Sequence, residues 1–206
     1  YMDIELCQLS KVYYFNLQKY YKILKERNTL LKKMVKNGSL LEDTLDVWDK
    51  QLCAYGTKLA EERKSFIEDL NLKAEKIHGD ISANKESLKI EYKESVDYSN
   101  FYEKMVKNRD KDIFYGNTCV GIHKDDMVFY INGNNARDYA SQGQQRTICL
   151  SLKMAEVELI NEKTGAYPVL LLDDVLSELD KNRQDYILKS INNIQTIITC
   201  TGLDEI

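Results

Sequence analysis

A single proline, Pro168, is found among the 206 residues of the chain, so few positions force a helix to stop. Charged residues make up 30% of the composition and hydrophobic residues 43%, a balance that favours long helices with one apolar face. The sequence therefore predicts helices of more than average length, in a chain long enough to bury a core.

Two long helices are predicted in the first third of the chain. An apolar stripe at steps of three, four or seven residues predicts the first, which ends at Gly38; the stripe consists of Leu6, Leu9, Tyr13, Leu17, Tyr20, Leu24 and Leu31. Residues 39–42 have the S-x-x-E form of a capping box and predict the start of the second helix. That helix keeps the alternation from Leu45 to Phe66, with one charged interruption at Glu62, and is predicted to end at His78-Gly79. A short turn between two such helices predicts an antiparallel hairpin, with its apolar faces packed together or, alternatively, available to a partner.

The pattern changes after the hairpin. Residues 88–92 alternate between apolar and charged, as a half-buried strand does, and residues 97–111 predict a short polar helix. Glycines and β-branched residues then become frequent, which places a domain boundary near Gly116. Residues 127–133 predict a strand that enters a tight Asn-Gly hairpin turn.

The last part of the chain alternates helices and strands. A helix is predicted at residues 144–161, followed by a turn at Gly165. The run YPVLLLDD at 167–174 is typical of a strand buried on both faces, and a helix at 181–191 leads to a second such strand, TIITCT. Strand, helix and strand in this order predict a right-handed parallel unit. The predicted fold class is therefore mixed α+β and α/β, with a helical arm (lid) domain at 1–115 and a second domain at 116–206.

Charge and cysteine content exclude several classes of protein. A net charge of −4 gives no global signature of nucleic-acid binding, and the lysines at 32, 33 and 36 are more typical of a solvated helix face than of a phosphate contact. The five cysteines include no C-x-x-C pair and no histidine at ligand spacing, which argues against zinc and against a disulfide framework. Neither a run of about 18 apolar residues nor a signal peptide is present, so a cytoplasmic protein without a membrane segment is expected.

Two carboxylates end the predicted strand at 167–174. Asp173 and Asp174 are delivered to the carboxyl edge of a parallel sheet, where open α/β folds bind ligands. Buried carboxylates need a metal, a hydrogen-bonding shell or a raised pKa. An apolar strand that ends in Asp is the pattern that holds Mg²⁺ in nucleotide-hydrolysing folds, where a second acid orients the attacking water. A merely solvated strand end is the alternative.

Short polar residues open the helix that precedes this strand. They are Ser141, Gln142, Gly143, Gln144 and Gln145. An amide-rich helix cap would account for one of them, whereas the whole set fits a turn whose backbone approaches an anion at a positive helix end.

Four segments together resemble the RecF family, recombination mediators among the ABC/SMC-like ATPases. They are YASQGQQRT, YPVLLLDDVLSELD, GIHKDD at 121–126 and LKERNTLLK at 24–32. The resemblance runs from about Asp3 to the end of the chain. Ile122 and Lys124 depart from it, since the family usually has proline and arginine at these positions.

The resemblance implies an ATP-dependent homodimer that uses Mg²⁺. Residues 141–145 would form the signature loop, which contacts the ATP held by the opposite subunit. Asp173 would hold Mg²⁺ through its coordination shell, and Asp174 would orient or deprotonate the water, slowly because its side chain is short. In the D-loop, Ser177 and Asp180 would couple the two sites, and Thr199 would stand at the switch position.

By the same resemblance, the dimer would clamp double-stranded DNA at single-strand gaps and junctions. With RecO and RecR as partners it would promote the loading of RecA. Hydrolysis would then release the clamp.

A phosphate-cradling loop is missing from the sequence. Residues 116–121 begin the pattern G-x-x-x-x-G but continue with Ile-His in place of Lys-Ser/Thr. The chain is therefore expected to be a C-terminal fragment without the Walker A region, inactive by itself. An SMC-type ATPase head and a non-enzymatic helical interaction module are the alternative functions.

Overall fold

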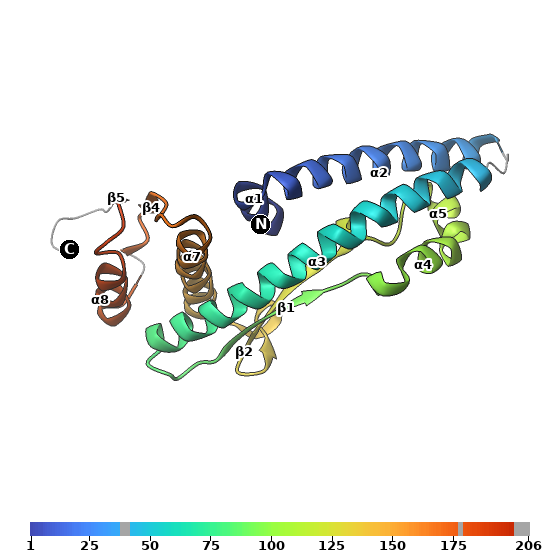
Figure 1. Cartoon of the computed structure of the whole chain (residues 1–206). Coiled ribbons are helices and arrows are strands. Elements are labelled where there is room, and N and C mark those ends of the chain that lie inside the picture. Colours follow the sequence, from blue (N-terminus) through green and yellow to red (C-terminus); the bar gives the residue numbers. More distant parts are fainter. Residues whose placement is uncertain (38–41, 177–178, 200–206) are drawn as a thin grey trace. The chain divides into compact units, whose positions relative to one another are not determined.

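The chain folds into long helices joined to two small sheets, shown in the computed structural model of Figure 1. The structure describes residues 1–37, 42–176 and 179–199. Among them, no helix combines the length and the hydropathy that crossing a bilayer requires. The elements in order are α1 (Met2–Leu9), α2 (Lys11–Asn37), α3 (Glu42–Ile81), β1 (Leu88–Lys93), η1 (Tyr98–Asn100), α4 (Phe101–Lys107), α5 (Arg109–Tyr115), η2 (Ile122–Lys124), β2 (Asp126–Ile131), β3 (Asn134–Asn135), α6 (Ala136–Tyr139), α7 (Gln142–Thr164), β4 (Leu170–Asp173), α8 (Lys181–Ser190) and β5 (Thr196–Thr199).

Two compact units make up the chain. The first comprises residues 1–67 and 92–127, and the second comprises residues 68–91 and 128–206. The predicted mixture of helices and strands is confirmed, and most of the predicted elements are present. The capping box predicted at 39–42 lies largely outside the described residues.

The first unit is built on the hairpin of α2 and α3 (Figure 1). Tyr13, Tyr20 and Leu31 of the predicted stripe are fully buried. The single helix expected before residue 38 is nevertheless broken at Ser10. The Ser10 hydroxyl accepts a hydrogen bond from the backbone N–H of Tyr13 (3.0 Å), so it caps the start of α2 and ends α1.

The single polar helix expected at 97–111 is also divided. The structure has η1 and α4, then α5, with the break at Asn108. The backbone N–H and the side-chain amide of Asn108 both donate to the carbonyl of Lys104, at 3.0 and 2.8 Å. This residue therefore terminates α4 before α5 begins.

A buried guanidinium lies in the middle of the hairpin. Arg27 on α2 is fully buried, and its Nε donates to Asp49 on α3 at 2.6 Å. Its Nη1 lies 2.8 Å from a carboxylate oxygen of Asp112 on α5 and donates to the hydroxyl of Thr118 at 2.7 Å. Asp49, Asp112 and Thr118 are fully buried as well. Four segments of the chain therefore meet around one positive charge.

A second buried guanidinium ties the start of the chain to its middle. Arg63 on α3 binds both carboxylate oxygens of Asp3 at 2.8 Å, and its Nε donates to the hydroxyl of Tyr13 at 3.0 Å. Its Nη1 donates to the carbonyl of Ile122 at 2.6 Å. This bidentate geometry fixes the direction of approach as well as the distance.

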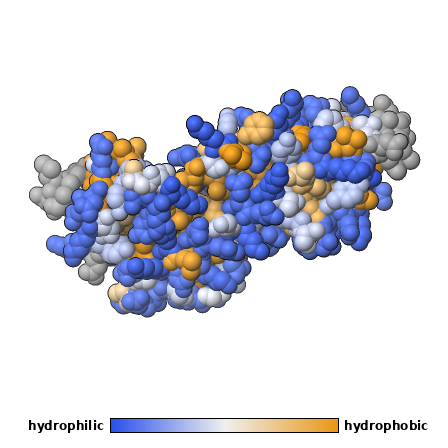
Figure 2. Space-filling model, viewed as in Figure 1, coloured by the Kyte–Doolittle hydropathy of each residue, from blue (hydrophilic) through white to orange (hydrophobic). Residues whose placement is uncertain are grey.

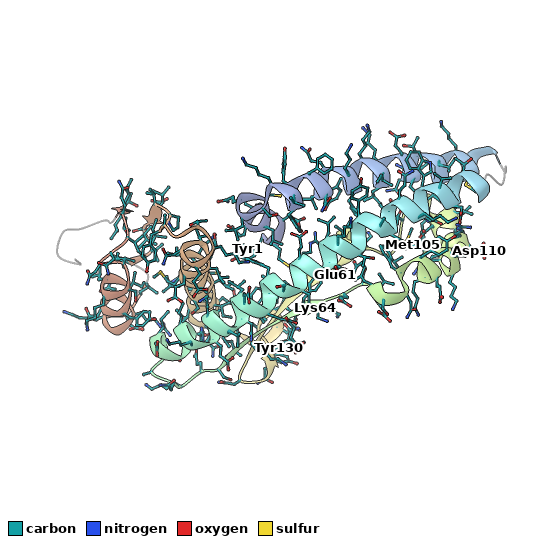
Figure 3. The ribbon with its side chains drawn as sticks, viewed as in Figure 1. Tyr1, Glu61, Lys64, Met105, Asp110 and Tyr130 are labelled. Carbon is teal, nitrogen blue, oxygen red and sulfur yellow. The ribbon has the colours of Figure 1, made fainter. Side chains whose placement is uncertain are left out.

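The position of Arg63 corrects one sequence prediction. The charged interruption was expected at Glu62, but Glu62 is only half-buried, and Arg63 is the charge that enters the core with 3% exposure. Glu61 and Lys64, on either side along α3, face solvent (Figure 3). A guanidinium enters more readily than a lone carboxylate because its donors can be satisfied in a planar fork.

The loop at 121–126 completes the first unit. Gly121 has φ +122°, and a Cβ there would lie 2.5 Å from the hydroxyl of Tyr20, so another residue would be both strained and crowded. Asp125 accepts hydrogen bonds from three residues between 92 and 98. Lys124 is exposed. Most of this loop is therefore engaged in folding the unit.

In the second unit, α7 packs beside the last part of α3. Four residues of α7, predicted to share one face, are buried; they are Ile148, Leu152, Ala155 and Leu159. Lys73 on α3 forms an ion pair with Glu162 on α7. The predicted Asn-Gly turn joins β2 to β3, with φ +50° at Asn132 and +80° at Gly133, as a type I′ turn requires.

β4 and β5 pair in parallel, from Leu170 opposite Thr196 to Asp173 opposite Thr199, which confirms the predicted parallel unit. The expectation that β4 is buried on both faces is wrong. Leu170 and Leu172 are buried, whereas Leu171 is 68% exposed. The described residues cover one face of this sheet only, and Figure 2 shows hydrophobic surface over these strands.

Replacing Arg27 with methionine is expected to destabilise the first unit. The change leaves the buried Asp112 carboxylate without the guanidinium that it contacts, whereas Asp49 keeps Arg109, whose Nε donates to it at 2.8 Å. Breaking a buried ion pair in this way costs about 3–5 kcal/mol. Chemical denaturation followed by circular dichroism measures the loss. Lys22→Met, at an exposed position on the same helix, is the control. A loss below about 1 kcal/mol for Arg27→Met would contradict the assignment.

The stability of the chain is expected to fall in acid. In the neutral imidazole of His123, Nε2–H donates to the carbonyl of Thr118 (3.1 Å) and Nδ1 accepts from the hydroxyl of Tyr20 (2.9 Å). Burial lowers the pKa of His123, and that of His78 moves in the same direction. The unfolded chain then binds protons first as the pH falls below about 6.5, so the free energy of unfolding decreases there.

We expect wild type to lose stability between about pH 7.5 and about pH 5.5, and His123→Gln to lose less over that interval. Denaturation midpoints at the two pH values provide the comparison. An equal loss in wild type and variant would show that His123 does not contribute.

Candidate functional site

An exposed turn opens α7 and is held by two reciprocal hydrogen bonds. The hydroxyl oxygen of Ser141 accepts from the backbone N–H of Gln144 at 3.2 Å, and the side-chain oxygen of Gln144 accepts from the backbone N–H of Ser141 at 2.9 Å. This capping box fixes the side chain of Ser141. Since the hydroxyl accepts in this pair, its hydrogen can be donated to a group outside the turn.

Two of the glutamines hold the turn in place. The side-chain amide of Gln145 donates to the carbonyl of Ala140 at 3.0 Å, and that of Gln144 donates to Glu86 at 3.0 Å. The side chains of Gln144 and Gln145 are thus engaged within the protein, and all five predicted residues remain candidates for contact with a ligand.

The first two residues of α7 present backbone donors. Gln142 and Gly143 are exposed, and no acceptor for their N–H groups is found in the part of the chain that the structure describes. A Cβ at Gly143 would meet nothing within 4 Å. No contact among the described residues therefore requires glycine at this position, and a negatively charged ligand at the helix N-terminus could use the donors.

The acidic pair at the end of β4 is organised by Thr199. The Thr199 hydroxyl donates to a carboxylate oxygen of Asp173 at 2.5 Å and accepts from the backbone N–H of Asp174 at 3.0 Å. Asp174 has φ +53°, a conformation that costs a non-glycine residue free energy. Asp173 and Asp174 are both exposed. Thr199 thus orients the carboxylate of Asp173 and holds the backbone of Asp174.

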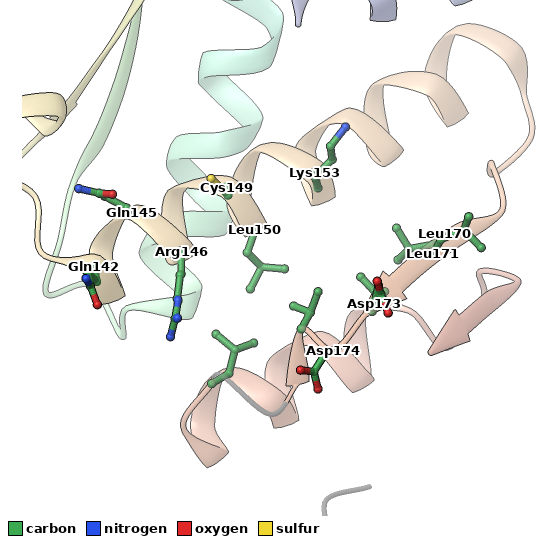
Figure 4. Close-up of a pocket in the computed structure, with 13 residues that line it drawn as sticks. Gln142, Gln145, Arg146, Cys149, Leu150, Lys153, Leu170, Leu171, Asp173 and Asp174 are labelled. Atoms are coloured by element: carbon green, nitrogen blue, oxygen red, sulfur yellow. The ribbon is translucent and has the colours of Figure 1, made fainter. Parts of the chain in front are cut away.

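A cavity of about 680 Å³ lies between α7 and β4 (Figure 4). Gln142 and Arg146 belong to its α7 wall, and Asp173 and Asp174 belong to its β4 side. The rest of the lining is largely aliphatic, as at Leu150. Arg146 and Lys153 add cationic side chains to this lining, opposite the carboxylates of Asp173 and Asp174.

The predicted D-loop is described only in part. Ser177 lies outside the described residues. Asp180 caps α8, since its carboxylate accepts from the backbone N–H of Arg183 at 3.1 Å and lies 3.3 Å from the Arg183 guanidinium. Its side chain is 56% exposed, so it remains accessible.

One residue of this site was not found from the sequence. Glu86 binds Gln144, but the two are 58 residues apart and no local pattern joins them. A charged residue just before a strand is an ordinary feature, so only the fold could reveal this contact.

Curated relatives match the whole chain. Two proteins described as DNA replication and repair protein RecF, from Agathobacter rectalis and Lachnoclostridium phytofermentans, are 49% and 52% identical to it over 205 residues. The chain spans 56% and 57% of the length of these relatives, somewhat more than half. No protein-family model matches the chain.

Solved structures match its fold. One describes the recombination mediator protein RecF with ATP in the RecFOR pathway, with a TM-score of 0.91 and 38% identity. Another describes RecF with ATPrS in that pathway, with a TM-score of 0.88 and 39% identity. Each match covers all of this chain and 57% of the other.

Gly143→Ala is expected to stabilise this chain. The position lies in the first turn of a helix with open space around it, and alanine favours a helix over glycine by up to about 1 kcal/mol. Thermal or chemical denaturation measures the change. A clear destabilisation would mean that a contact within the protein requires glycine.

Proposed function

This chain belongs to the RecF family, and on that premise we propose that it supplies the signature loop and the magnesium-binding strand of an ATP-dependent DNA clamp. The phosphate-cradling loop would lie in the part of the protein outside this chain. In the proposal, residues 1–115 form the helical arm and residues 116–206 the signature half of the ATPase domain. The protein would act in the cytoplasm.

The exposed turn at Ser141 is the observation that carries the proposal. A rigid serine with a hydrogen to donate stands beside two backbone N–H groups for which the described residues offer no acceptor. Short donors at the N-terminus of a 23-residue helix suit the γ-phosphate of ATP held by a second subunit. Gly143 would let that phosphate approach the backbone closely.

The acidic pair suits the metal side of the same reaction. The described residues bond one oxygen of Asp173, through Thr199, and the other oxygen can serve a Mg²⁺ coordination shell. Bound Mg²⁺ would neutralise charge on the triphosphate. Asp174 would orient or deprotonate the attacking water, and its short side chain suits slow hydrolysis.

Closure of two subunits around ATP would bring these groups together. Asp180 and Ser177 would couple the two sites. The closed dimer would hold double-stranded DNA near single-strand gaps or junctions, and with RecO and RecR it would promote RecA loading. Hydrolysis would open it again.

Ser141→Arg in the full-length protein is expected to abolish ATP-dependent dimerisation. The long cationic side chain would fill the space that the phosphate needs and remove the hydroxyl donor. Light scattering with and without ATP measures the assembly, and Ser190→Arg on α8 serves as a control with the same change of charge. Gly143→Ala, which keeps the fold, should weaken dimerisation by crowding the phosphate. A wild-type protein that stays monomeric with ATP would refute the clamp.

A further inference from the structure

The side-chain amide of Gln144 is bound at both ends. Its oxygen accepts from the backbone N–H of Ser141 (2.9 Å), and its nitrogen donates to a carboxylate oxygen of Glu86 (3.0 Å). Reversing the amide would set donor against donor and acceptor against acceptor. Glu86 therefore determines which way Gln144 points, and Gln144 in turn completes the cap of Ser141.

Glu86 is itself held firmly. It lies in the segment between α3 and β1, and its side chain is 18% exposed. Its backbone N–H donates to the hydroxyl of Ser82 at 3.3 Å. The turn before it has left-handed residues at Ala83 (φ +52°) and Asn84 (φ +58°), and the N–H of Asn84 donates to the carbonyl of Gly79 at 2.7 Å.

His78 joins this contact to the body of α7. The second carboxylate oxygen of Glu86 lies 3.2 Å from Nε2 of His78, which is fully buried on α3. Nδ1 of His78 lies 3.1 Å from the hydroxyl of Ser151 on α7. The path from Gln144 through Glu86 and His78 thus returns to α7 two turns further along, and forms a closed ring of side chains.

We propose that Glu86 is a positioning residue for the nucleotide-contacting turn of α7. It fixes Gln144, and through Gln144 it keeps the hydroxyl of Ser141 and the first backbone N–H groups of the helix directed at the same point. Glu86 does not contact the nucleotide in this role. The inference rests on the proposed function, since it names the group that prepares the same turn.

A carboxylate suits this role better than an amide. Both oxygens of Glu86 accept, one from Gln144 and one from Nε2–H of His78. A glutamine would offer one acceptor and one donor, so one of the two partners would face a group of its own kind. Bonds to an ionised acceptor are also stronger than neutral ones.

Glu86→Ala in the full-length protein tests the proposal. We expect the ATP concentration for half-maximal dimerisation to rise by about 10-fold or more, the scale for residues that orient a directly acting group. ATP binding to the monomer, measured at protein concentrations too low for dimerisation, should not change. Glu86→Gln should give a smaller loss of the same kind.

The variant Gln144→Ala shows whether Glu86 acts through Gln144. If it does, Glu86→Ala combined with Gln144→Ala should be no worse than either change alone. Glu162→Ala is the matched control, because it removes another carboxylate that bonds α7 to α3, eighteen residues from Gln144. It should leave dimerisation unchanged.

Amide hydrogen exchange in the same proteins separates this inference from the function on which it rests. Loss of Glu86 should speed exchange at the N–H of Gln144, whose acceptor is Ser141, and not in the middle of α7. Unchanged exchange there in both Glu86 variants overturns the positioning role, whether or not the protein dimerises. So do additive losses with Gln144→Ala, or dimerisation by Glu86→Ala at wild-type ATP concentrations. If wild type fails to dimerise while exchange responds as expected, the clamp is refuted and the positioning of the turn by Glu86 stands.

Discussion

The first unit depends on two guanidinium groups that water does not reach. Burying a charge costs several kcal/mol unless hydrogen-bond acceptors surround it. Arg27 and Arg63 can therefore be buried only where their partners lie close together. Arg27, which lies on α2, requires groups from α3, α5 and the segment at Thr118. Arg63 requires Asp3 and the carbonyl of Ile122. Leucines alone would tolerate several registers of the α2–α3 hairpin, whereas these two guanidinium groups reach their carboxylates in one register.

Much of the fold can be predicted from local sequence patterns, and the features that were missed depend on contacts between residues far apart in the sequence. Apolar spacing predicted α2, α3 and α7, and an Asn-Gly pair predicted the β2–β3 turn, because each depends on residues close in sequence. Arg27 was missed although it stands at an inward position of its stripe, between Leu24 and Leu31. A charge at such a position signals a buried partner, but the sequence does not say which carboxylate will meet it. The open face of β4 was missed because an apolar sequence shows that a strand can be buried but does not show which elements cover it.

The candidate site also has some contacts that the sequence predicts and others that only the fold reveals. Ser141 and Gln144 are three residues apart, so a capping box between them follows from helix geometry, and the acids after an apolar strand follow from sheet topology. The bond from Thr199 to Asp173 depends on the register of β4 and β5, which the sequence leaves open. The proposed roles of the site residues came from the resemblance to a family, and the contact between Glu86 and Gln144 was found only in the structure.

Two features of the second unit cost this chain stability, and a third exposes apolar surface. Asp174 carries a left-handed backbone, which costs on the order of 1 kcal/mol or more, and Gly143 gives up helix stability in open space. Leu171 exposes an apolar side chain beside the acidic pair. Such costs persist where another requirement exceeds them. Under the proposed function, a triphosphate that needs close backbone approach at Gly143, and acids set at a fixed angle after β4, would account for the first two together, because the proposal places both in one pocket shared between subunits. In the proposed clamp, stability within one chain and readiness for a partner would therefore make opposite demands at these positions.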